Sequence, residues 1–127
     1  MIARDRLFVA LDTPDACAAR RLVDRLQGHV GGFKIGLELF IACGPELVRE
    51  VQRGGSAVFL DLKLHDIANT VAGAAAAIAR LGVSYFTLHA SGGARMIGDG
   101  VEAARRAAGD AGRSDGGLES RVERGAT

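Results

Sequence analysis

The sequence predicts an α/β protein with a parallel sheet, because a short apolar segment, a turn and an amphipathic helix follow one another four times. The apolar segments are residues 7–12, 33–39, 57–63 and 83–89. They are continuous apolar runs rather than alternating ones, which is typical of parallel strands covered by helices. Strands that alternate with helices at this spacing indicate right-handed βα units.

The first two helices have recognisable boundaries. Thr13 offers an N-cap and Pro14 the first helical position, and Gly28 can end this helix. The second helix is predicted to open at Pro45 and to stop at Gly54.

The last two helices follow the same pattern. The third carries Val71, Ala75 and Ile78 at helical spacing and ends at Gly82. The fourth follows the loop sequence ASGG and passes through residues 96–104.

The end of the chain has a different composition. Residues 109–127 are rich in glycine and charge and contain no strand-like run. We therefore expect one domain over residues 1–108, followed by a tail that is disordered or foreign to the fold.

Composition and charge set limits on function. The chain has 127 residues, of which 48% are apolar and 24% charged, as in a single globular domain. A net charge of +1 gives no electrostatic reason to expect nucleic acid or a membrane surface as a partner. No segment approaches the roughly 18 apolar residues of a membrane span. With Cys17 and Cys43 isolated, we expect a cytoplasmic protein.

Polar side chains mark the C-terminal end of every predicted strand. Active sites of parallel α/β proteins collect at this edge, so we expect the side chains to share one rim. They are Asp12, Lys34, Glu38, Asp61, Lys63 and His89.

Asp61 and Lys63 form the centre of this charged group. Residues two apart in a strand point to the same face, and Lys34 from the neighbouring strand can reach the same space. A lysine flanked by carboxylates is expected to stay protonated and can donate a proton. A salt-bridge network that only closes one end of the fold would explain the same spacing.

The residues after this strand allow more than one interpretation. Asp66 can act as an N-cap of the third helix. His65 fits an exposed loop position, and His89 can orient the loop at residues 90–93, whose glycines fit a tight turn better than a phosphate cradle. Because no second histidine or cysteine stands at ligand spacing, we expect no metal site.

Five segments together resemble a known family. Residues 7–106 are similar to the N-terminal half of the bacterial orotidine 5′-phosphate decarboxylase family, whose signature is Asp-x-Lys-x-x-Asp. The matching segments are VALD (9–12), FKIGLELF (33–40), GPELVRE (44–50), FLDLKLHDIANT (59–70) and HASGGARM (89–96). The resemblance implies a TIM barrel, of whose eight βα units four are present as a half-barrel.

The resemblance also implies a reaction and the residues that perform it. Orotidine 5′-monophosphate would lose carbon dioxide and become uridine 5′-monophosphate, the last step of pyrimidine synthesis, without cofactor or metal. Lys63 would protonate C6, and Asp61 would face the substrate carboxylate. Lys34 and Asp12 would hold the ribose and orient the charged array.

A homodimer is part of the same expectation. In the family, the residues that match Asp66 and Thr70 cross the dimer interface and enter the partner's site. Ala68 departs from the proline or glycine expected at its position, which makes the turn after Asp66 less rigid.

Two alternatives remain open. Hexulose-phosphate synthases share the signature, but they are expected to carry an acidic residue where this chain has Lys34. The chain also lacks counterparts of the later strands and of the phosphate-binding residues, as a truncated chain, a frameshift product or a fragment would. We therefore expect little activity from it alone, and a non-catalytic half-barrel that assembles with itself or with a second half is the other interpretation.

Overall fold

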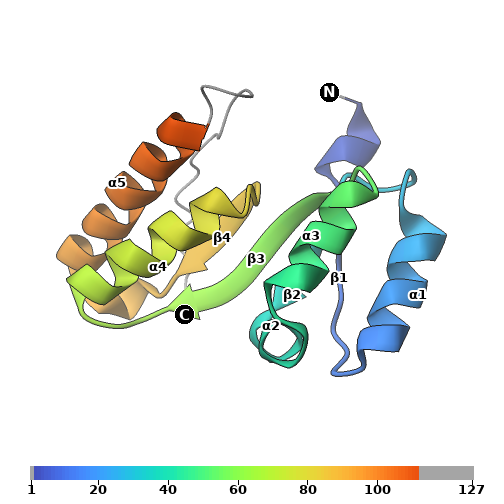
Figure 1. The fold of residues 1–127 in the computed structure, drawn as a ribbon, viewed down its shortest axis with the longest axis horizontal. Coiled ribbons are helices and arrows are strands. Elements are labelled where there is room, and N and C mark those ends of the chain that lie inside the picture. Colours follow the sequence, from blue (N-terminus) through green and yellow to red (C-terminus); the bar gives the residue numbers. More distant parts are fainter. Residues whose placement is uncertain (1, 112–127) are drawn as a thin grey trace. The chain divides into compact units, whose positions relative to one another are not determined.

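The computed structural model describes residues 2–111, with side chains described through residue 110. Its four strands form one sheet in the order β1-β2-β3-β4, and the β1–β2 and β2–β3 pairs are parallel. The predicted βα organisation is therefore confirmed (Figure 1). The chain divides into two compact units, Met1–Leu62 and Lys63–Thr127, which are described separately.

The first unit contains three strands, with β3 extending two residues into the second unit. Its elements are the 3₁₀ helix η1 (Ala3–Arg6), β1 (Phe8–Ala10), α1 (Ala16–Leu26), β2 (Gly32–Gly36), α2 (Leu37–Cys43), α3 (Pro45–Arg53) and β3 (Ala57–Leu64).

Gly32 is the first residue of β2, the strand between β1 and β3. In the sheet it stands between Phe8 of β1 and Ala57 of β3. A Cβ atom at Gly32 would lie 2.3 Å from the carbonyl oxygen of Ala57 and 2.5 Å from Cε1 of Phe8. Only glycine fits this position without displacing a strand.

The core of the first unit consists of the apolar runs that predicted its strands, together with one face of α3. Apolar side chains that leave water supply the main stabilisation of such a core. Its largest fully buried side chains are Leu11, Phe33, Ile35, Leu39, Leu47, Val48, Val51, Val58 and Leu60.

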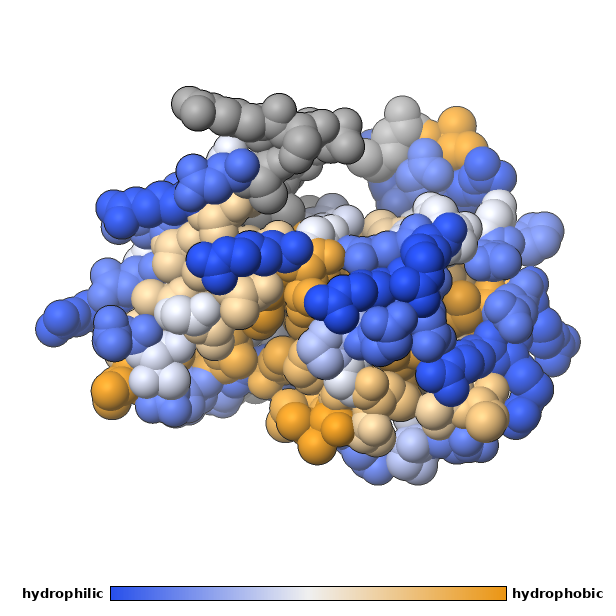
Figure 2. Space-filling model, viewed as in Figure 1, coloured by the Kyte–Doolittle hydropathy of each residue, from blue (hydrophilic) through white to orange (hydrophobic). Residues whose placement is uncertain are grey.

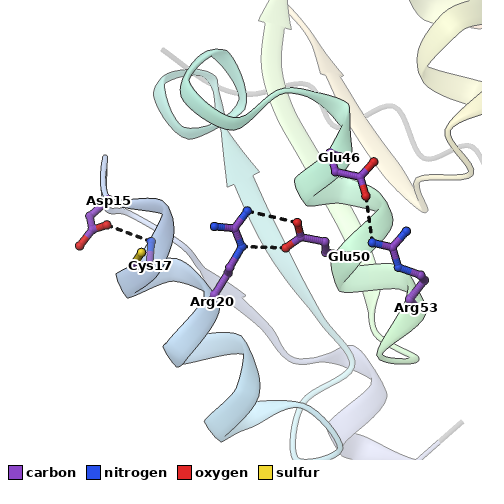
Figure 3. Close-up of polar contacts among 6 residues, drawn as sticks. All are labelled: Asp15, Cys17, Arg20, Glu46, Glu50 and Arg53. Carbon is purple, nitrogen blue, oxygen red and sulfur yellow. Dashed lines mark hydrogen bonds and ion pairs between the residues drawn. The ribbon is translucent and has the colours of Figure 1, made fainter.

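Helix α1 begins later than predicted. Its N-cap is Asp15, whose side chain accepts a hydrogen bond from the backbone N–H of Cys17 at 2.9 Å (Figure 3). Thr13 instead accepts one from the backbone N–H of Asp15 at 3.2 Å. The prediction of Thr13 as N-cap was wrong because Thr13 and Asp15 can both cap a helix, and Asp15 is the one whose side chain bonds to the first turn.

A bidentate ion pair joins α1 to α3. Nε and Nη2 of Arg20 donate to the two carboxylate oxygens of Glu50 at 2.8 and 3.1 Å (Figure 3). These hydrogen bonds lower the pKa of Glu50 below its ordinary value. Two parallel hydrogen bonds fix the relative orientation of the groups as well as their distance.

Helix α2 was missed by the sequence prediction. The run at residues 33–39 was assigned to a strand, but β2 ends at Gly36 and Glu38 lies in the first turn of α2. Leu37 and Ile41 of this short helix are exposed, and Figure 2 shows a hydrophobic area over the region of α2. An apolar run that continues from strand into helix gives no signal of the change.

The second unit contains the end of β3, α4 (Ala68–Arg80), β4 (Tyr85–Leu88), the 3₁₀ helix η2 (Ala90–Gly92) and α5 (Gly93–Ala111). Helices α4 and α5 lie side by side (Figure 1). Their buried contact consists largely of alanines, which allow close approach of the two helix backbones; they are Ala75, Ala79, Ala104 and Ala107.

Helix α5 continues past the domain boundary expected at residue 108 and is described through Ala111. Residues 112–127 of the expected tail lie outside the described residues. In the described part of the chain, no helix has the length and apolar character needed to cross a membrane.

Candidate functional site at the carboxyl ends of the strands

Lys34 of β2 and Asp61 of β3 lie close together: Lys34 is in the middle of its strand, and Asp61 stands opposite Gly36, the last residue of β2. Lys34 stands opposite Phe59 in the sheet, and Asp61 follows Phe59 by two residues, so both side chains lie on the same face. Nζ of Lys34 is 3.5 Å from Oδ2 of Asp61. The predicted proximity of these two side chains is confirmed.

Burial distinguishes this ion pair from the surface pairs of the chain. Asp61 is the only charged residue that is buried among those the structure describes, with 9% of its surface exposed. The ammonium group of Lys34 compensates part of the cost of removing this carboxylate from water. In parallel α/β proteins, active sites collect towards the carboxyl edge of the sheet, where this ion pair lies.

The space beside this pair is open. Gly36 stands opposite Asp61 in the sheet, and a Cβ atom at Gly36 would meet no atom within 4 Å. Asp12 is exposed and follows β1, where the backbone N–H of Leu11 donates to the carbonyl oxygen of Lys34 at 2.9 Å. Asp12 therefore directly follows a residue that is paired with the Lys34 backbone.

Lys63 begins the second unit and has an unusual backbone. Its φ angle is +49°, and it is the only residue other than glycine with positive φ among those described. This conformation costs a residue with a side chain about 1–2 kcal/mol. The alternation of side chains along a strand holds for extended residues, so a shared face for Asp61 and Lys63 stays a prediction.

Two hydrogen bonds from β4 and its end hold this segment of β3. The backbone N–H of Lys63 donates to Oγ1 of Thr87 at 2.8 Å, and the N–H of His89 donates to the carbonyl oxygen of Leu64 at 2.9 Å. The side chain of Lys63 is exposed. Thr87 was not singled out from the sequence, although a hydroxyl group inside an apolar strand was a visible signal.

Asp66 lies in the turn between β3 and α4. Its Oδ1 accepts a hydrogen bond from the backbone N–H of Ile67 at 2.7 Å. Ile67 is the N-cap of α4, so Asp66 does not act as the plain N-cap that its residue type allows. Asp66 lines an open cavity of about 780 Å³, together with His65, Asn69 and Arg95.

Thr70 is exposed in the first turn of α4.

The two histidines near this cavity contact each other. The rings of His65 and His89 are stacked, with 4.8 Å between their centroids. Nδ1 of His89 accepts a hydrogen bond from the backbone N–H of Ser91 at 3.1 Å, so His89 does orient the loop that follows β4. Across residues 2–110 no group of three or more side chains has the composition and spacing to hold a metal ion.

The strand order and the buried ion pair define a parallel α/β protein with a charged site at the carboxyl ends of its strands. The model of the orotidine 5′-phosphate decarboxylase / HUMPS family matches residues 5–117, and the chain belongs to this family. The resemblance deduced from the sequence segments is confirmed.

Curated relatives extend well beyond the matched part. The orotidine 5′-phosphate decarboxylase of Moorella thermoacetica is 53% identical over 108 residues, which cover 85% of this chain and 43% of that protein. The enzyme of the same name from Syntrophotalea carbinolica is 50% identical over 103 residues, which cover 81% and 42%. The chain thus spans less than half the length of these relatives.

A solved structure shows the same fold. The orotidine 5′-phosphate decarboxylase of Lactobacillus acidophilus matches with a TM-score of 0.72 and 36% identity, over 80% of this chain and 46% of that one. The four parallel strands and their helices correspond to half of a TIM barrel, as predicted.

Proposed function

We propose that this chain carries the charged catalytic array of an orotidine 5′-phosphate decarboxylase. The observation that supports this most directly is the buried Asp61 carboxylate of β3, paired with Lys34 of the parallel strand β2. Family membership and the names of the relatives support the same reaction. The substrate is orotidine 5′-monophosphate and the products are uridine 5′-monophosphate and carbon dioxide.

Lys63 is the proton donor in this proposal. The bond between C6 and the carboxylate breaks, its electron pair stays on C6, and carbon dioxide leaves. This carbanion has little resonance stabilisation, so a fixed ammonium group beside C6 lowers its energy electrostatically. The same ammonium then gives its proton to C6, which completes the reaction without cofactor or metal.

Asp61, Lys34 and Asp12 bind and orient the substrate. Asp61 faces the substrate carboxylate, and repulsion between the two carboxylates favours the loss of carbon dioxide. Lys34 holds Asp61 in place through their ion pair and reaches the ribose. Asp12 binds the ribose from the end of β1.

Asp66 and Thr70 act in the site of a second copy. The proposed enzyme is a homodimer in which both residues cross the interface and contact the partner's substrate. Their exposure fits this role, because neither side chain is committed to the core of its own unit. The open cavity beside Asp66 leaves this surface accessible to a partner.

A synthase acting on a hexulose phosphate is the second candidate, because the matched family includes both kinds of enzyme. Lys34 separates the two. A lysine paired with Asp61 fits the decarboxylase, whereas the synthases are expected to carry an acidic residue at this position. An acidic residue there would repel Asp61 rather than pair with it.

The proposal is tested by incubating the purified chain with orotidine 5′-monophosphate and following the loss of its absorbance. We expect activity that Lys63→Ala abolishes and that is at least about 1000-fold below that of the Moorella thermoacetica enzyme, because remote binding contacts contribute to catalysis. A chain that is folded yet no more active than Lys63→Ala would instead favour the non-catalytic half-barrel. Turnover of a hexulose phosphate alone would favour the synthase.

A further inference from the structure

The end of β4 holds the segment around Lys63 at three points. Thr87 accepts the hydrogen bond from the Lys63 N–H, and the His89 N–H donates to the carbonyl oxygen of Leu64. The third point is the stack of the His65 and His89 rings. The hydrogen bond from His89 to Leu64 and the histidine stack are compatible with an ordinary extended strand. The hydrogen bond from the Lys63 N–H to the Thr87 side chain is not part of a backbone ladder.

In a regular parallel sheet, backbone carbonyl oxygens accept the hydrogen bonds of the neighbouring strand. At Lys63 a side-chain hydroxyl takes this part. The positive φ angle of Lys63 turns the chain out of the extended conformation just after its N–H, and the Thr87 hydroxyl accepts the hydrogen bond of that N–H. Without this acceptor the hydrogen bond at Lys63 would be lost, and the extended conformation would regain its advantage.

From this geometry we propose that Thr87 is a positioning residue, whose hydroxyl selects the left-handed backbone of Lys63 and thereby the direction of the Lys63 side chain. The catalytic significance of this role rests on the proposed function. Backbone strain of this kind persists where surrounding contacts enforce it, and it collects at functional sites. Thr87 touches the backbone of the proton donor and acts through it.

The test compares Thr87→Val, which keeps the branched shape and removes the hydroxyl, with Thr87→Ser, which keeps the hydroxyl. The readout is the Lys63 amide in nuclear magnetic resonance spectra of the ¹⁵N-labelled chain. In Thr87→Val we expect its hydrogen exchange to be about tenfold faster, as for a lost hydrogen bond, and its HN–Hα coupling to move to the value of an extended strand. Thr87→Ser should restore both observables to those of the unchanged chain.

Two outcomes would overturn the proposal: a Lys63 amide that is unchanged in Thr87→Val, or Thr87→Ser behaving like Thr87→Val. If Thr87→Val fails to fold, hydrogen exchange of the Lys63 amide in the unchanged chain still tests the proposal. A Lys63 amide that exchanges as fast as an unprotected loop amide there would show that the hydrogen bond to Thr87 does not form.

Activity measurements separate this proposal from the proposed function. If the chain turns over orotidine 5′-monophosphate, Thr87→Val should lower kcat with little change in KM, because a misplaced proton donor affects the transition state more than binding. An inactive chain with the expected Lys63 signals would refute the function of the isolated chain and leave the positioning role of Thr87 intact. Equal kcat in both variants would overturn the positioning role.

Discussion

The backbone of Lys63 is held in a conformation that glycine would adopt at no cost. Its φ angle of +49° lies in the left-handed region, and the hydroxyl of Thr87 receives its N–H. A lysine at such a position implies that its side chain has a function that offsets the cost of the strained backbone. In the proposed reaction this function belongs to the ammonium group, because a charged proton donor at this point both stabilises the carbanion and protonates it.

Stability measurements on Lys63 variants test the strain directly. We expect Lys63→Gly to be more stable than Lys63→Ala by about 1 kcal/mol, since glycine tolerates positive φ and alanine does not. In an extended strand the order is the reverse, with glycine the less stable. Urea denaturation of the two variants decides between them, and a less stable Lys63→Gly would contradict the left-handed backbone.

Residue types predicted one contact of the candidate site better than they predicted backbone geometry. Lys34 and Asp61 were expected together because both were predicted near the ends of neighbouring parallel strands, and they form an ion pair although Lys34 lies in the middle of β2. The left-handed conformation of Lys63 could not be foreseen, because positive φ is signalled by glycine or asparagine, not by lysine. Thr87 was overlooked since its importance depends on that conformation.

At the level of elements, helices α1 and α3 of the first unit are joined at their surface by Arg20 and Glu50, above a core of buried apolar residues. Helix boundaries at Pro45 and the strand positions followed from the sequence, because proline and apolar runs act locally. The helix α2 did not, since its residues continue the apolar run of β2 without a breaker. Short elements are decided by packing rather than by propensity.

The ion pair of Arg20 and Glu50 predicts a dependence of stability on pH. The hydrogen bonds from Arg20 lower the pKa of Glu50 in the folded chain below its ordinary value of 4.5. A lowered folded pKa means that the pair stabilises the fold above the unfolded value, and that this contribution is lost as the pH falls through the folded pKa. Glu50→Gln should therefore be less stable than the unchanged chain at neutral pH, and the difference should shrink in acid.

Urea denaturation from pH 7 down to about pH 3 measures this difference. Glu46→Gln is the matched control, because Glu46 pairs with Arg53 of the same helix, α3 (Figure 3). This substitution removes a carboxylate and leaves the ion pair between α1 and α3 in place. The difference in free energy of unfolding between Glu50→Gln and the unchanged chain could also stay constant through this range. That result would show that the lowered pKa of Glu50 does not govern stability.

For the whole molecule, the sheet order leaves β1 and β4 each with one neighbour among the described strands. An edge strand presents unpaired backbone groups that can pair with another chain. The curated relatives are more than twice as long as the part that matches, since that part covers 43% and 42% of two of them. In a closed barrel of parallel strands both edges are paired, so the remainder of a relative is a natural partner for these edges.

We expect the chain to bind the remaining part of the Moorella thermoacetica enzyme when that part is supplied as a separate chain. Sedimentation should show a one-to-one complex, and decarboxylation should rise by about 100-fold or more over the chain alone, because the added half supplies the missing remote contacts. Lys63→Ala serves as the control, since it should form the complex and leave it inactive. Association without any gain in activity would mean that the edges pair but the catalytic array is not completed. A chain that stays monomeric beside the added half would refute pairing through β1 and β4.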